Sequence, residues 1–243
     1  MKPLSTRSVA FVSVFAAFHV TLYLISPPVL WRNWAIFLAP IEGIILGPWA
    51  GFSAALIGSA IGRIVLPNPF WMFGIIAEPL SVLTAGFLVR RTWKPVMVIY
   101  AVMFLAYFAS PLGRELPVWP LSDTVIALFL IYPAAVLSKN LFGESIENLS
   151  EKRWRSGFWR LSVSFAIVSF ITVATDGFVR VFLLVPAGLY NVLFMTQGEV
   201  LSAFVGGGIE SFVEDALVIV VSLVVGVPIL LALRKMNFEK PLS

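Results

Sequence analysis

The sequence has no cysteine and a single histidine, His19. Missing thiols exclude disulfides, thiolate metal sites and cysteine nucleophiles. A zinc hydrolase is not expected either, because its metal is usually held by more than one histidine. The sequence also lacks a G-x-x-x-x-G-K-[ST] phosphate loop and the H-E-x-x-H and G-x-S-x-G motifs. We therefore predict a non-enzymatic chain with no catalytic residues, no metal site and no cofactor.

Charge is scarce as well. Charged residues make up 12% of the 243 residues, about half the share of a soluble domain, while 59% are hydrophobic. The mean hydropathy is +0.95. No hydrophilic linker divides the chain, so residues 1–243 are predicted to form a single integral membrane domain. The expected fold is an all-α polytopic bundle of about 6–8 transmembrane helices.

Seven apolar segments are long enough to cross about 30 Å of hydrocarbon, which takes about 20 helical residues. They are residues 8–26, 48–66, 71–89, 96–112, 121–138, 158–175 and 212–233. We expect the first to be kept as a transmembrane helix, because no small-x-small cleavage pattern follows it.

The positions of the basic residues set the expected topology. Lys and Arg gather in four places: Lys2/Arg7, Arg90/Arg91/Lys94, Lys139 with Lys152/Arg153/Arg155/Arg160, and Arg234/Lys235/Lys240. These share one side only if residues 34–46 cross as a short eighth helix. Four of the 17 Lys and Arg residues then lie outside: Arg32, Arg63, Arg114 and Arg180. The positive-inside rule predicts both termini in the cytoplasm and a multi-pass location in the cell membrane.

Residues 177–209 are apolar but interrupted by Pro186-Ala187-Gly188 and Gly206-Gly207-Gly208. A full crossing here would move the last basic cluster to the outer side. We therefore predict an outer re-entrant element or lid, hinged at the three glycines and lining a cavity or buried in protein. The last helix is then expected to begin at a capping box formed by Ser211 and Glu214.

Ionisable groups inside membrane spans are expected to face the bundle interior or a wet cavity. Glu78 lies within the 71–89 span, and two alternatives are open: Arg63 neutralises it, or Glu78 contacts a ligand. Asp176 and Arg180 are spaced i,i+4 in the order that favours an ion pair. Glu42, in the short pass, is equally suited to a packing role or a ligand role.

The outer aromatic residues are candidates for stacking on a planar ligand, or for anchoring at the membrane interface. An acid-rich outer surface favours a neutral or cationic ligand. The candidate ligand-binding residues are Glu78, Arg63, Trp34, Trp71, Asp176, Arg180 and Tyr190.

Small residues recur every four positions at Gly47, Gly51, Ala55 and Ser59. Such a stripe lets another helix approach closely. Two interpretations remain open: packing inside the bundle, or a sliding contact with another subunit in which Gly51 and Ala55 form a coupling face.

The segment PIEGIILGPWAG from Pro40 to Gly51 runs into Ala54, Gly58 and Gly62-Arg63, followed by Glu78-Pro79-Leu80 and Ala85-Gly86. The closing segment has Ile209-Glu210, then Pro228 and Arg234-Lys235. This pattern resembles the substrate-binding (S) components of energy-coupling-factor (ECF) type ABC transporters, which commonly combine a short helix, a "GP..G" turn, a Gly-rich helix and an "E…G" helix.

The resemblance implies a subunit that binds a vitamin, cofactor precursor or similar micronutrient from outside. It also implies delivery through a transmembrane coupling subunit and two ATP-hydrolysing subunits. Glu78 would contact the ligand, and Ser13 and Ala17 would stand where the family has its Ala-x-x-x-Ala coupling motif. On this hypothesis, Glu78→Ala weakens ligand binding and leaves folding intact.

Two rival hypotheses belong to other classes. One is a self-sufficient secondary transporter, driven by ions through Glu42, Glu78 and Asp176. The other is an intramembrane enzyme acting on a lipid, with a divalent metal at Glu210 and Asp215. Partners expected in every case are a small-molecule substrate and membrane lipids, and no nucleic acid.

Overall fold

A computed structural model describes residues 6–26, 32–142 and 151–235. Within this part of the chain there are helices and turns but no strand, so the prediction of an all-α fold is confirmed. The elements are α1 (Thr6–Leu24), η1 (Trp34–Phe37), α2 (Ala39–Leu46), α3 (Pro48–Val65), α4 (Trp71–Val89), α5 (Trp93–Ala109), α6 (Pro111–Glu115), η2 (Trp119–Leu121), α7 (Ser122–Leu137), η3 (Ser138–Asn140), α8 (Glu151–Leu184), α9 (Leu189–Val192), α10 (Gln197–Val221), the π-helical turn η5 (Ser222–Gly226) and α11 (Val227–Lys235).

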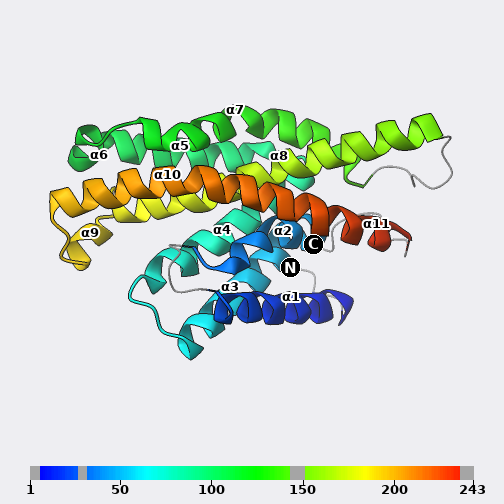
Figure 1. The fold of residues 1–243 in the computed structure, drawn as a ribbon, viewed down its shortest axis with the longest axis horizontal. Helices are drawn as coiled ribbons and strands as arrows, with labels where there is room; N and C mark the ends of the chain where they lie inside the picture. Colours follow the sequence, from blue (N-terminus) through cyan, green and yellow to red (C-terminus); the bar gives the residue numbers. More distant parts are fainter. Residues whose placement is uncertain (1–5, 27–31, 143–150, 236–243) are drawn as a thin grey trace.

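The helices lie along a common long axis (Figure 1). In that view α5 and α7 run along the top, α8 and α10 through the middle, and α1 and α3 along the bottom. The two central helices pack against each other, and α4 joins the halves because it contacts both α3 and α8. The short helix α2 is buried along its whole length between its neighbours.

The two ends of the bundle are called here the α9 end and the α11 end, after the helices labelled there (Figure 1). At the α11 end, the turn at Gly47-Pro48 lies against Gly86, near the end of α4. At the same end, Arg234 Nε donates to the Leu141 carbonyl across 3.0 Å. The basic residues that end α4, follow α7 and end α11 therefore gather at one end of the molecule.

Within the described part of the chain, five helical segments are long and apolar enough to cross a membrane: Pro48–Val65, Trp71–Val89, Trp119–Leu137, Ser156–Leu184 and Gln197–Arg234. Two shorter apolar helices, Ser8–Leu24 and Trp93–Ala109, accompany them. The segments predicted at 48–66 and 71–89 match α3 and α4 almost to the residue.

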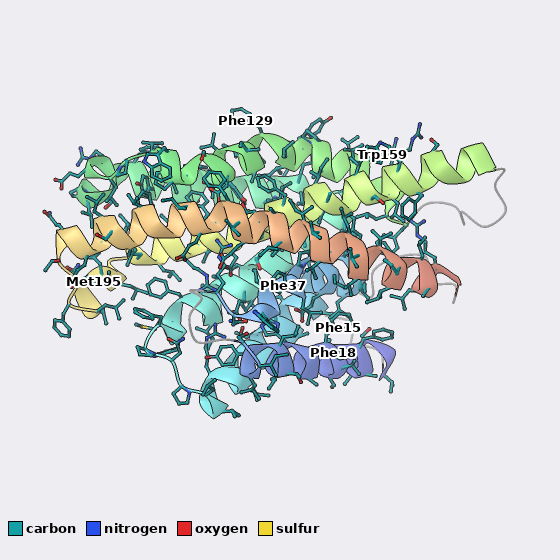
Figure 2. All side chains as sticks on the ribbon, in the orientation of Figure 1. Phe15, Phe18, Phe37, Phe129, Trp159 and Met195 are labelled. Carbon is teal, nitrogen blue, oxygen red and sulfur yellow. The ribbon has the colours of Figure 1, made fainter. Side chains whose placement is uncertain are left out.

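The outer surface of the bundle carries many large apolar side chains. Phe129, Trp159 and Phe18 lie on it (Figure 2), with exposed fractions of 75%, 70% and 56%. Exposed apolar surface on this scale is costly in water and normal in a bilayer. Composition, span length and surface thus agree on a membrane protein.

The lid predicted over residues 177–209 is wrong. Helix α8 continues unbroken to Leu184, and α10 begins at Gln197, so Gly206-Gly207-Gly208 lies inside a continuous helix rather than at a hinge. The chain turns instead at Pro186 and at Gly188, whose φ of 76° lies in the left-handed region that glycine tolerates. Gly208 serves close packing, because a Cβ there would lie 2.5 Å from Pro120 Cβ.

The capping box predicted at Ser211 and Glu214 is also wrong. The box forms at the real helix start, where Glu199 N donates to Thr196 Oγ1 (3.3 Å) and Thr196 N donates to Glu199 Oε2 (2.7 Å). The sequence Thr196-Gln197-Gly198-Glu199 carries the same [ST]-x-x-E signature, about four helical turns before the predicted start at Ser211. Ser211 and Glu214 are therefore left for other contacts.

Candidate functional site

Ionisable side chains form a continuous buried network through the middle of the bundle. It joins residues from α1, α2, α3, α4, α8 and α10 with Arg32, which precedes η1. Nitrogen and oxygen atoms are visible between the ribbons in this region (Figure 2). Charges so far from water require partners, and usually mark a functional site in a membrane protein.

Glu78 on α4 is the centre of the first half of the network and is 1% exposed. Arg63 Nη1 donates to its Oε2 at 3.1 Å, and Arg63 Nη2 pairs with its Oε1. Asn33 Nδ2 donates to Oε1 at 2.7 Å, and the Ser59 hydroxyl donates to Oε2. With Arg180 Nη2 3.5 Å away as well, the carboxylate is saturated with donors.

His19 lies between two carboxylates and is fully buried. Its Nε2 is 3.0 Å from Glu78 Oε2, and its Nδ1 is 3.4 Å from Glu42 Oε2. An imidazole donates from both nitrogens only when it carries a proton on each. If both carboxylates are ionised, His19 therefore acts as an imidazolium that joins them.

Three glycines make room for these large polar groups. A Cβ at Gly58 would lie 2.5 Å from His19 Cβ, and one at Gly74 would lie 1.6 Å from Arg63 Nη2. A Cβ at Gly177 would lie 2.4 Å from Arg32 Nη2. The small residues that the sequence spaces along its helices thus serve the network directly.

Arg32 is the centre of the second half and is 5% exposed. Its Nε lies 3.0 Å from Glu214 Oε2 and 3.3 Å from Asp176 Oδ2. Its Nη2 donates to Ser211 Oγ at 3.0 Å, and its Nη1 lies 3.7 Å from Asp215 Oδ1. One guanidinium therefore holds α8 and α10 to the segment before η1.

Arg180 joins the two halves. Its Nε donates to Asp176 Oδ2 at 2.7 Å, which confirms the predicted i,i+4 pair. Its Nη2 reaches Glu78 Oε1. Of the two alternatives left open for Glu78, the ion pair with Arg63 forms. Glu78, Arg63, Asp176 and Arg180, from three helices, thus meet in one network.

A cavity of about 100 Å³ lies against the second half of the network, toward the α9 end. Arg32, Asp123, Arg180 and Glu214 contribute charged groups to its wall, and Glu210 stands exposed beside them. The rest of the wall is mainly apolar and includes Phe70, Phe73, Leu121, Val181, Leu184 and Phe204. Apolar walls with a few placed polar groups are typical of small-molecule sites.

The three aromatic candidates lie elsewhere. Trp71 lines a separate groove of about 290 Å³ on the surface with Arg63. Trp34 is 38% exposed, with its backbone N donating to Ser26 Oγ, and Tyr190 packs on the apolar core from α9. None of them lines the 100 Å³ cavity.

The small-residue stripe packs inside the bundle. Ala55 is fully buried, and a Cβ at Gly51 would lie 2.8 Å from Val82 Cγ1. These two residues cannot form a coupling face in this conformation, and that prediction is corrected. Ser13 and Ala17 differ, because both lie on the exposed side of α1.

Arg32, Asp123 and Glu214 are not among the ligand-site residues predicted from the sequence, and Asp215 appears there only in the enzyme hypothesis. The sequence assigns Glu214 to a capping box at a helix start that the structure does not have. The signal available in the sequence was the position of the acidic residues: they lie within apolar segments, where an ionisable side chain usually marks a functional site. Among the described residues, no group of three or more His, Asp or Glu side chains is arranged to hold a metal ion.

Comparison with known proteins adds one relative. The chain is similar to the uncharacterized protein MJ0923 of Methanocaldococcus jannaschii, at 28% identity over 141 residues. The match covers 57% of this chain and 43% of that protein, so the chain spans less than half of the relative's length. No family model matches the chain, and no solved structure matches it.

Proposed function

We propose that this protein is the substrate-binding subunit of a micronutrient importer in the cell membrane. The observation that carries the proposal is the cavity at the α9 end, with Arg32, Asp123, Arg180 and Glu214 in a mainly apolar wall. Such a site binds and orients a small solute without performing chemistry on it. The buried network behind the cavity keeps its charged groups in fixed positions.

The distribution of basic residues supports an orientation. Arg90, Arg91, Lys139 and Arg234 lie at the α11 end, which the positive-inside rule assigns to the cytoplasm. The α9 end then faces outward, and so does the cavity. Both termini are cytoplasmic in this arrangement, and a solute is captured from outside, as an importer requires.

The energy for import is proposed to come from partners. The resemblance to S components of ECF transporters suggests a transmembrane coupling subunit and ATP-hydrolysing subunits, and the sequence has no phosphate loop of its own. The exposed face of α1 around Ser13 and Ala17 supports the same proposal, because it leaves small side chains free for close helix contact.

The test is purification of the tagged protein from its native membrane in mild detergent, followed by mass spectrometry. Co-purification of ATP-hydrolysing subunits with a second helical membrane protein is the expected result. Recovery of the protein without partners, under conditions that keep another importer of the same cell intact, would contradict the proposal.

A second candidate function, ion-coupled secondary transport, is favoured by one observation. Glu42 is fully buried, and its Oε1 has no hydrogen-bond partner among the described residues. Together with His19 and Glu78 it could accept and release a proton or sodium ion during a transport cycle. Currents from the purified chain alone on solid-supported membranes, driven by pH or sodium gradients and lost in Glu42→Gln, would establish this function instead.

A further inference from the structure

A groove adjoins the cavity at the α9 end. This groove, of about 680 Å³, lies between the segment before α4 and the start of α10. Groove and cavity share Phe70, Ala203 and Gly207 in their walls. A Cβ at Gly207 would meet nothing within 4 Å, so glycine leaves open space where the two meet. The shared wall makes this groove the candidate route by which a solute from the α9 end would reach the charged groups.

The network behind the cavity has too few cations. Six carboxylates take part: Glu42, Glu78, Asp123, Asp176, Glu214 and Asp215. They are balanced by the three guanidinium groups of Arg32, Arg63 and Arg180 and by His19. With all six carboxylates ionised, two negative charges remain even when His19 is protonated. Residues 27–31, next to Arg32 in the chain, contain no ionisable side chain that could supply the difference.

The uncompensated charge lies on the cavity side of the network. Asp215 is 4% exposed, and neither of its oxygens has a hydrogen-bond donor within the described residues. Asp123 and Glu214, its electrostatic neighbours, both line the cavity. The Asp123 carboxylate accepts a bond from Thr124 N at 2.7 Å. A buried carboxylate without donors is costly, and a bound cation removes that cost.

The remaining wall restricts the kind of cation. Phe70, Phe73 and Phe204 present aromatic surface to the cavity. Aromatic faces attract ammonium groups and accept the apolar part of a ligand. A bare metal ion would find no set of three His, Asp or Glu ligands among the described residues. The volume of about 100 Å³ suits a group of a few non-hydrogen atoms.

We propose that this cavity takes a small organic cation, with a protonated amine near Asp123, Glu214 and Asp215 and its apolar part against the phenylalanines. This inference rests on the proposed function, because it concerns the same cavity, and it adds the class of substrate. A negatively charged group placed beside these three carboxylates would be repelled by them, so we expect anionic ligands to bind more weakly there than cationic ones.

The experiment uses the absence of cysteine in this chain. Two variants are made, each with a single cysteine. Gly207→Cys places it where groove and cavity meet, and Gly198→Cys places it in the wall of the groove only. Both glycines lie on α10 with nothing within 4 Å of a Cβ, so they form a matched pair. Each thiolate is reacted with cationic 2-aminoethyl or anionic 2-sulfonatoethyl methanethiosulfonate, which forms a mixed disulfide and releases methanesulfinate.

The quantity measured is the ratio of the cationic to the anionic reaction rate. At Gly207→Cys this ratio is expected to exceed that at Gly198→Cys by about tenfold or more, because a charged cleft concentrates counter-ions to this extent. Adding Asp123→Asn to Gly207→Cys should lower the ratio, and excess butylammonium should slow labelling where butanol does not. If Gly207→Cys fails to fold, Ala203→Cys, in the same shared wall, replaces it.

Equal ratios at the two positions, or a preference for the anionic reagent at Gly207→Cys, would overturn the proposal. Labelling requires neither partner subunits nor uptake. A cation preference in a protein that purifies without partners would therefore refute the importer while leaving the substrate class intact. A protein that purifies with its partner subunits but shows no cation preference would support the importer and refute the substrate class.

Discussion

The two halves of the buried network differ in how well their charges are satisfied. Around Glu78, five side chains supply donors, and the site is closed. Around Asp215, neither carboxylate oxygen has a donor among the described residues, and a cavity lies alongside. The first arrangement is what a bundle needs to hold its helices together, and the second is what a binding site needs before its ligand arrives.

The comparison changes the role expected for Glu78. As a lone carboxylate in an apolar span it is a natural candidate for a ligand contact. In the folded protein its oxygens are already occupied, so a ligand would have to displace Arg63, His19 or Asn33. We therefore expect Glu78 to act mainly on stability, and a ligand to contact the less satisfied carboxylates near the cavity instead.

The largest expected effect comes from Glu78→Ala. Removing the carboxylate leaves Arg63 and His19 buried without their main partner, which should lower the free energy of unfolding by about 3–5 kcal/mol. Unfolding in mixed detergent–SDS micelles measures the change. This outcome would replace the prediction that folding stays intact. A variant as stable as the wild type would show that the first half of the network is not a structural element.

A smaller effect is expected from Gly86→Ala. The new methyl carbon would lie 2.3 Å from Pro48 N and 2.4 Å from Pro48 Cα, backbone atoms that cannot move aside cheaply. We expect a loss of about 1–3 kcal/mol in the same assay. Gly206→Ala, also in a helix but with open space at its Cβ, is the matched control and should be neutral or slightly stabilising. If both variants lost the same free energy of unfolding, the close contact with Pro48 would not explain the effect at Gly86.

Asp215→Asn sharpens the contrast between the two halves. Because the carboxylate has no donor to lose and lies near Asp123 and Glu214, the substitution should change the free energy of unfolding by no more than about 1 kcal/mol, or stabilise the protein. Asp176→Asn, which disturbs the pairs with Arg32 and Arg180, should cost clearly more. The opposite ranking in the unfolding assay would refute the division of the network.

The smallest effect on stability is expected from Ala17→Leu, on the exposed side of α1. An exposed substitution should alter the free energy of unfolding by about 0.5 kcal/mol or less. If this face docks on a coupling subunit, the variant should nevertheless lose its partners in the pull-down. Ala101→Leu, equally exposed on α5, is the control and should keep them. Loss of partners in both variants would remove α1 as the docking face.

Local patterns predicted much of the secondary structure. Proline, glycine and hydropathy fixed the limits of α3 and α4, and i,i+4 spacing predicted the Asp176–Arg180 pair. Prediction failed where one sequence pattern is compatible with two structures. The glycines at 206–208 suggested a hinge, but all three lie inside α10: Gly208 packs closely against Pro120, and a Cβ at Gly206 or Gly207 would meet nothing within 4 Å. That error displaced the last helix start and hid Glu214 and Asp215.

The sequence by itself determined an all-helical, apolar chain with basic residues at one end of the bundle, because hydropathy and helix signals act over a few turns. Only the tertiary structure decided which charges meet. Arg32 and Ser211 are 179 positions apart in the chain, yet they share a hydrogen bond. Such contacts depend on how six helices pack and on which glycines leave room between them, and no short-range pattern encodes that arrangement.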